Sequence, residues 1–163
     1  MAQTFHLRLL LEGQDDLIYE VRKSEADRLK RILAGENWAD LMFWFDTIDG
    51  RSVLVNLAYL QGARYLWDVA PAPPDSRVSA DDHMRIALRG RQVISEWPSE
   101  DSKDVYTLFW ELELGLEKVT FTDVDGEDFT LIAHQIVYLT APKEVIDEGR
   151  RLVEGEDDGG AES

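Results

Sequence analysis

The sequence predicts an α+β protein built from two copies of one β-β-α-β-β unit, with mainly antiparallel sheet. The segment F-D-T-I-D-G at residues 45–50 returns as F-T-D-V-D-G at 121–126, an offset of 76 residues. The segment H-L-R-L-L-L-E-G at 6–13 returns as H-M-R-I-A-L-R-G at 83–90, an offset of 77. An internal repeat defines the unit of folding, so both copies should form the same elements.

The elements of the first copy follow from the spacing of its apolar residues. Alternate apolar positions predict strands, apolar positions three and four apart predict a helix, and Asp49-Gly50 predicts a two-residue hairpin turn because this dipeptide tolerates positive φ. The predicted elements are strands at 7–11 and 17–21, a helix from Ser24 to Gly35, strands at 41–46 and 53–57, and a turn with a last strand at 59–66.

The second copy repeats this order. Its predicted elements are strands at 84–88 and 93–97, a helix at 99–114, strands at 118–122 and 129–133 around Asp125-Gly126, and a last strand that ends at Pro142. The predicted organisation is therefore a first repeat (1–68), a proline-rich linker (69–82), a second repeat (83–141), a C-terminal helix (142–153) and a disordered acidic tail (154–163).

The two copies should share one core. A unit of about 65 residues buries little apolar surface alone, so we expect the copies to pack against each other about a pseudo-twofold axis. Residues 41–45 are apolar at every position, whereas a strand with one wet face should alternate. This strand is therefore either covered on both faces or part of an interface.

Composition limits the classes of function. The 163 residues carry a net charge of −16, so we expect the chain to repel polyanions, and nucleic-acid binding is disfavoured. The longest apolar runs are far shorter than the roughly 20 residues of a membrane helix. The first residues resemble no secretory leader and the chain has no cysteine, so we expect a cytoplasmic protein without a membrane segment.

No arrangement of residues predicts a catalytic, cofactor or metal site. His6 and His83 occupy matching positions but lack the spaced histidine or cysteine partners of a zinc site. The acidic residues after Phe121 do not match a calcium loop, since position 12 counted from Asp123 is His134 rather than glutamate. Nucleophile-elbow and phosphate-loop motifs are missing as well. We therefore expect no enzyme, no cofactor and no metal.

One part of the second copy resembles a known family. The segment V-T-F-T-D-V-D-G-E-D-F-T-L-I-A-H-Q-I-V-Y-L-T-A-P at 119–142 is similar to the hairpin, closing turn and last strand of Sm-like and Hfq-like proteins. Residues 55–66 resemble the same pattern more loosely. Members of this family are small β-barrels that assemble into rings and often bind RNA, so the resemblance implies a ring-forming, RNA-binding module.

These observations favour a non-enzymatic interaction or assembly protein, whose partner is another protein or a second copy of the chain. The aromatic residues beyond the needs of the core are the candidate contact surface: Trp44, Tyr65, Trp67 and Trp110. The first alternative is an Sm-like RNA-binding module that uses Arg51, Asn56 and Arg64. The second alternative is a small-molecule binder in the groove between the repeats.

Overall fold

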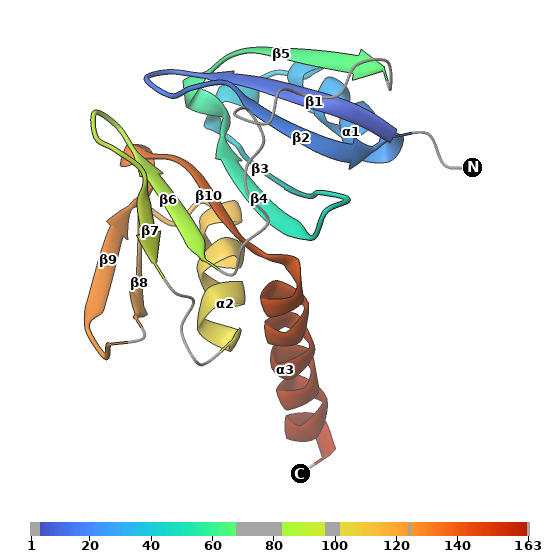
Figure 1. The fold of residues 1–163 in the computed structure, drawn as a ribbon. Helices are drawn as coiled ribbons and strands as arrows, with labels where there is room; N and C mark the ends of the chain where they lie inside the picture. Colours follow the sequence, from blue (N-terminus) through green and yellow to red (C-terminus); the bar gives the residue numbers. More distant parts are fainter. Residues whose placement is uncertain (1–3, 68–82, 97–101, 124, 163) are drawn as a thin grey trace.

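The computed structural model describes residues 4–67, 83–96, 102–123 and 125–162, and its two halves repeat the same elements (Figure 1). The first copy contains β1 (Thr4–Leu11), β2 (Leu17–Arg22), α1 (Lys23–Ala34), β3 (Met42–Asp46), β4 (Arg51–Asn56) and β5 (Leu60–Trp67). The second contains β6 (Met84–Leu88), β7 (Ile94–Glu96), α2 (Ser102–Glu113), β8 (Lys118–Thr122), β9 (Asp128–Ile132) and β10 (Ile136–Pro142), and α3 (Lys143–Glu162) follows it. The predicted α+β class with antiparallel sheets is confirmed.

Local details also repeat between the copies. One turn of 3-10 helix precedes β5 at Leu57–Tyr59 and precedes β10 at Ala133–Gln135. Both predicted hairpin glycines have positive φ, 93° at Gly50 and 83° at Gly126, but the predicted two-residue turns are wrong. Each loop has three residues, since Thr47 donates to Arg51 and Gly50 donates back to Thr47, as Asp123, Glu127 and Gly126 do in the second copy. A two-residue turn of this type needs positive φ at the aspartate as well, and here only the glycine adopts it. The same local sequence signals therefore produce the same turns in the two copies.

Some predicted boundaries shift or fall outside the described residues. The helix α1 begins at Lys23 rather than at Ser24, because β2 runs directly into it and its cap residue, Arg22, makes no side-chain capping bond. The linker at 69–82 lies outside the described residues, as do Trp97 and the predicted first turn of α2 at 99–101.

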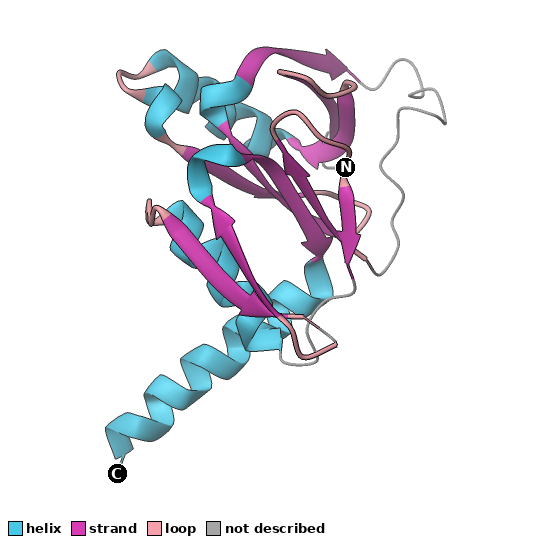
Figure 2. Ribbon diagram, turned by 90° about the vertical axis from the view of Figure 1, so that its left-hand side faces the viewer, coloured by secondary structure: helices cyan, strands magenta, loops and turns pink. Residues whose placement is uncertain are grey.

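The C-terminal helix is longer than predicted. Helical backbone runs from Lys143 to Glu162, past the predicted end at residue 153 and through the segment predicted to be disordered. An α-helix makes its own backbone hydrogen bonds, so it can continue beyond the residues that pack on the body. In Figure 2 its last turns extend away from the sheets. Within the described part of the chain, no helix is long and apolar enough to span a membrane.

The strands form three antiparallel sheets. Their strand orders are β2-β1-β5, β3-β4-β10-β6-β7 and β8-β9. Within each copy the arrangement is the same, since β7-β6-β10 corresponds to β2-β1-β5 and the hairpin β8-β9 corresponds to β3-β4. The copies are joined where β4 of the first pairs with β10 of the second, in a register that places Leu54 opposite Leu139.

The predicted pseudo-twofold axis is wrong. A twofold axis would repeat the β4–β10 pair as a β9–β5 pair, but among the described residues β9 pairs only with β8 and β5 only with β1. The copies therefore meet head to tail, through different strands of the same unit. The physical reason is that the two hairpins differ in their outer faces. The strand β4 is buried at every position, whereas β8 and β9 keep exposed polar residues such as Lys118 and Thr120 on one face, so the second hairpin offers no apolar surface for an equivalent contact.

The core lies on both faces of the five-stranded sheet. Phe43 and Phe45 of β3 pack into a cluster with β1, β2 and α1, whereas Met42 and Trp44 pack against a second cluster with α2. The strand that is apolar at every position is therefore covered on both sides. Arg28 donates to the carbonyl of Trp44, which also ties α1 to this strand.

Candidate binding groove between the two copies

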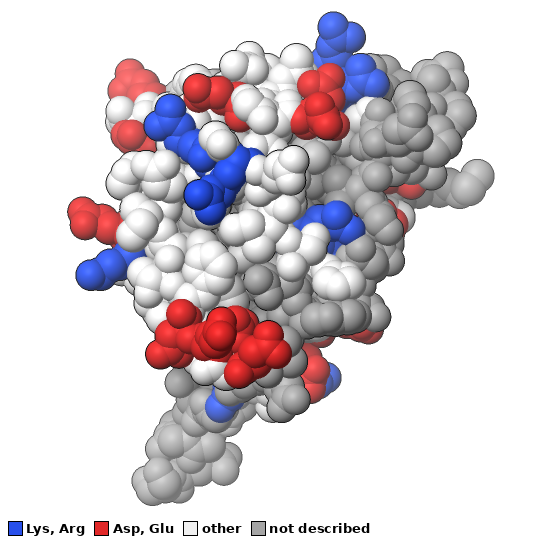
Figure 3. All heavy atoms as spheres, turned by 60° about the vertical axis from the view of Figure 1, so that its left-hand side comes forward, with Lys and Arg blue, Asp and Glu red and all other residues white. Residues whose placement is uncertain are grey.

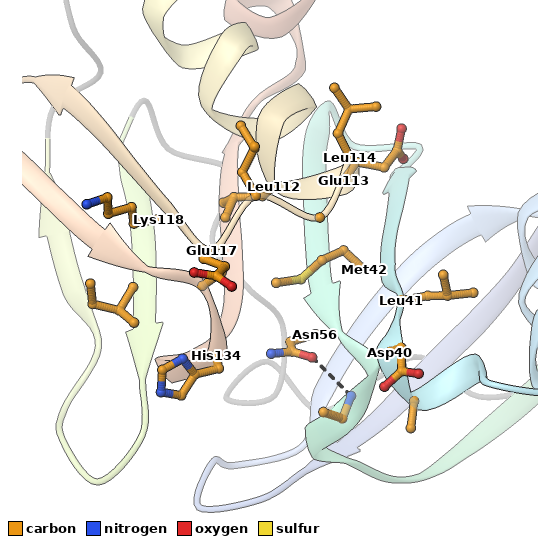
Figure 4. A pocket seen from close by; sticks show the side chains of 16 residues that line it. Asp40, Leu41, Met42, Asn56, Leu112, Glu113, Leu114, Glu117, Lys118 and His134 are labelled. Atoms are coloured by element: carbon orange, nitrogen blue, oxygen red, sulfur yellow. Dashed lines mark hydrogen bonds between the residues drawn. The ribbon is translucent and has the colours of Figure 1, made fainter.

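A groove of about 750 Å³ lies where the first copy meets the second (Figure 4). One wall is residues 39–42 with Asn56 and Ala58, and the other is residues 112–118 with 132–134. The walls come from matching places in the two units, because both include the segment that leads from the helix into the following strand. The head-to-tail contact thus creates the groove, and neither copy has it alone.

Large apolar side chains are concentrated at this groove. Half of the eight exposed large hydrophobic side chains of the described residues line it: Leu41, Leu114, Leu116 and Ile132. Leu114 is the most exposed of them, at 62%. Single exposed apolar residues are ordinary on a protein surface, but several that line one concavity are typical of a binding site.

The polar residues of the groove are mostly acidic. Its lining includes three carboxylates and one lysine, with one histidine: Asp40, Glu113, Glu117, Lys118 and His134. Partial burial raises the pKa of Glu113, and the guanidinium groups of Arg28 and Arg150 act in the opposite direction. The groove is therefore an apolar concavity with a negative rim.

Asn56 fixes the floor of the groove. Its Nδ2 donates to the carbonyl of Ile136 at 2.9 Å, and its Oδ1 accepts from the backbone N–H of Ala58 at 3.0 Å (Figure 4 shows the second bond). The first bond crosses from β4 to β10, so the side chain holds the copies together. A floor that is fixed in this way keeps the groove preformed, which lowers the entropy cost of binding.

The structure buries two of the three residues predicted to contact RNA and leaves the third exposed. Arg51 is 1% exposed, and its Nη2 donates to the carbonyl of His83 at 2.8 Å and to Thr140 Oγ1 at 2.6 Å. Asn56 is also buried. Both side chains join the two copies and do not present their donors to a ligand. Only Arg64 is exposed, on β5 and away from the groove.

The aromatic residues predicted to form one contact surface lie in different places. Trp44 and Trp110 line a shallow second hollow of about 360 Å³ together with Arg28 and Arg150. Trp44 packs on Tyr106 and Phe109, whereas Trp110 is 45% exposed. Tyr65 lies on β5 beneath the ammonium of Lys30, and the side chain of Trp67 lies outside the described residues.

The histidines are separated by the fold. His6 is buried on β1, His83 directly precedes β6, and His134 lies at the groove. Among the residues that the structure describes, no three histidine, aspartate or glutamate side chains gather as a metal site would require.

Sequence reasoning missed the apolar side chains at the groove. Leu114 and Leu116 flank Gly115 in the connection between α2 and β8, where Gly115 has a positive φ of 93°. The signal in the sequence was two leucines placed in a turn, where large apolar side chains do not contribute to the core. The opposite wall is not readable from the sequence, because it depends on how the copies dock.

The fold and the groove define a class of protein, an α+β pseudo-dimer of two ββαβββ units joined head to tail. No protein-family model matches the chain, and neither a curated protein nor a solved structure matches it. The geometry of its surfaces therefore indicates its function.

Proposed function

We propose that this protein is a non-enzymatic interaction protein that binds an apolar segment of a protein partner in the groove between its two copies. The observation that carries the proposal is the set of four exposed leucine and isoleucine side chains that line this groove. A hydrophobic concavity of this kind gains free energy when a partner removes its apolar surface from water.

The charge of the groove supports a partner segment with basic flanks. Three carboxylates lie among the residues that line it, against one lysine, and the whole chain carries a net charge of −16. Opposite charge on the partner speeds encounter and excludes acidic competitors. We therefore propose that the bound segment carries leucine-like side chains flanked by lysine or arginine.

A peptide-display screen tests this proposal. We expect the selected peptides to combine large apolar residues with lysine or arginine, and to bind one per chain in a calorimetric titration. Ile132→Ser should weaken their binding about tenfold or more, because it removes an anchor from the groove. Leu114→Ser should act in the same direction.

Ile48→Ser is the matched control. Ile48 is 44% exposed and lies outside the groove, whereas Ile132 is 41% exposed and lines it, so the two substitutions remove similar apolar area from the surface. Selected peptides that bind Ile132→Ser and the unmodified protein equally would exclude this groove as the site. Selection of acidic peptides would contradict the proposed electrostatics.

A small apolar molecule is the second candidate, favoured by the groove volume of about 750 Å³. Pockets for small ligands commonly measure about 300–1,000 Å³. Titration with the neutral dye Nile red checks this candidate, with a single saturable site that Leu114→Ser weakens as the expected result. For either ligand we place the protein in the cytoplasm, in line with its lack of cysteine.

A further inference from the structure

Two strand edges are left over from the contact that joins the copies. In that contact, β4 uses the edge that β3 does not occupy, and β10 uses the edge that β6 does not occupy. The equivalent edges belong to β9 and β5, and within the described residues no strand pairs with either of them. The edges of β4 and β10 pair inside the chain. The equivalent edges of β9 and β5 could pair in the same way between two chains.

The backbone of β9 is oriented for such pairing. The N–H of Asp123 donates to Glu127, and the N–H of Ala133 donates to Glu117, so the odd-numbered residues of β9 bond to β8. In an antiparallel ladder alternate residues face opposite edges. The backbone groups of Asp128, Thr130 and Ile132 consequently point toward the unoccupied edge, as those of their equivalents in β4 point toward β10.

The side chains at the leftover edges carry complementary charges. In the internal contact Arg51 of β4 bonds to Thr140 of β10. At the offset of 76 residues, Arg51 corresponds to Glu127 and Thr140 corresponds to Arg64. An acidic residue stands at one edge and an arginine at the other, so the same contact between two chains would place opposite charges together.

Two arginines lie together on the β5 side of this contact. Arg64 lies directly opposite Arg8 across β5 and β1, and like charges in this position repel. Nε of Arg8 is buried and has no hydrogen-bond partner among the described residues. Figure 3 shows a dense group of acidic side chains in the lower part of the described surface. The tip of the β8–β9 hairpin is itself acidic and carries Asp123, Asp125, Glu127 and Asp128. That tip would bring negative charge to the two arginines.

We propose that the chain associates head to tail with a second copy of itself, β9 of one chain adding to β5 of the next with Thr130 opposite Ala63 and Glu127 beside Arg64. This register is the internal β4–β10 register carried to the equivalent residues. Because the internal contact is not related by a twofold axis, its repetition between chains does not close at a dimer, and it produces a ring or an open chain of molecules.

The contact between chains should be weaker than the internal one. In the internal contact, α2 of the second copy packs on Met42 and Trp44 of β3. The equivalent residues of β8 are Lys118 and Thr120. These polar residues offer a neighbouring helix no apolar surface, so strand pairing and charge supply most of the affinity. We expect association in the micromolar range or weaker, as for small transient interfaces.

Sedimentation equilibrium of the full chain, from micromolar to millimolar concentration, tests the proposal. The average mass should rise with concentration beyond that of a dimer. Arg64→Glu and Glu127→Arg should each weaken association about tenfold or more, because each places like charges together. The double variant Arg64→Glu, Glu127→Arg should recover most of the affinity, which a general loss of folding would not allow.

Proline substitutions test the strand pairing itself. Thr130→Pro removes an N–H that faces the unoccupied edge and should abolish association. Thr120→Pro is its matched control, since Thr120 pairs with Thr130, loses the same hydroxyl contact and has its N–H on the other edge of the hairpin. A monomer at every concentration would overturn the proposal, as would an oligomer that neither Thr130→Pro nor Arg64→Glu disturbs. Neither result depends on what the groove binds.

Discussion

The guanidinium of Arg51 on β4 donates a hydrogen bond to Thr140 Oγ1 on β10, joining residues 89 positions apart across the contact between the two copies. The same group donates to the carbonyl of His83, just before β6. One buried side chain therefore fixes three strands that belong to different halves of the molecule.

We expect Arg51→Ala to lower the free energy of unfolding by about 3 kcal/mol or more. A hydrogen bond from a charged donor contributes about 1.5–3 kcal/mol, and the substitution also leaves a cavity and two acceptors without their donor. Urea unfolding followed by tryptophan fluorescence measures the change. Arg151→Ala, at an exposed arginine of α3, is the control and should stay within about 0.5 kcal/mol of the original protein.

The docking of α3 on α2 depends on a glycine. A Cβ on Gly149 would lie 2.7 Å from the Cβ of Tyr106 and would clash with the carbonyl of Ser102. Gly149→Ala should therefore lower the free energy of unfolding by about 2 kcal/mol or more. Gly155→Ala in the same helix meets open space, and because alanine favours helix it should leave stability unchanged or raise it by up to about 1 kcal/mol. Equal melting temperatures for the two variants would contradict the packing of α3.

Tyr19 should make the protein sensitive to alkali. Burial raises the pKa of Tyr19 well above its ordinary value, and its hydroxyl has no hydrogen-bond partner among the described residues. Above about pH 10 the unfolded tyrosine ionises while the folded one stays neutral, so stability falls as pH rises, by up to about 1.4 kcal/mol per pH unit.

Tyr19→Phe should remove much of this alkaline loss. At pH 8 it should also leave stability unchanged or raise it by about 1 kcal/mol, because a buried hydroxyl without a partner is unfavourable. Urea titrations at pH 8 and pH 11 provide both values. Burial raises the pKa of Tyr138 as well, so some alkaline sensitivity should remain. A substitution that leaves the pH dependence unchanged would show that the ionisation of Tyr19 is not its cause.

The first copy should not fold stably by itself. In a fragment of residues 1–68, β4 loses its partner β10, and the cluster around Phe43 and Phe45 loses Val137 and Tyr138. We expect this fragment to aggregate or to unfold without a sharp transition, as followed by circular dichroism during heating. A monomeric fragment with a cooperative transition would show that the copies are independent domains.

Much of the fold could be predicted because its signals are local. The alternation at 7–11 and the Asp-Gly pairs at both hairpins depend only on neighbouring residues, so they predicted the strands and the places of the turns in both copies, although each turn is one residue longer than predicted. The start of α1 was misplaced by one residue, since the polar residue Ser24 suggested a cap where β2 continues directly into the helix. Boundaries of this kind depend on the chain on both sides.

The candidate site was harder to predict. Arg51 and Asn56 carry good donors for a nucleic acid, and nothing in their sequence neighbourhood indicates that β10 would bury them. Trp44 was correctly marked as lying on a strand with two apolar faces, but its partners Tyr106 and Phe109 come from the other copy. The groove at Leu114 and Leu116 needs both copies in place before it exists.

The sequence by itself determined the repeated unit, its order of elements and the glycines of its turns, because period and turn chemistry act within a few residues. The tertiary structure alone decided that the copies meet head to tail, through β4 and β10. Identical units offer several complementary edges, and the choice among them depends on packing between residues 80 or more positions apart, such as Asn56 and Ile136. That choice made Arg51 a buried link between the copies and left β5 and β9 each with a single strand partner among the described residues.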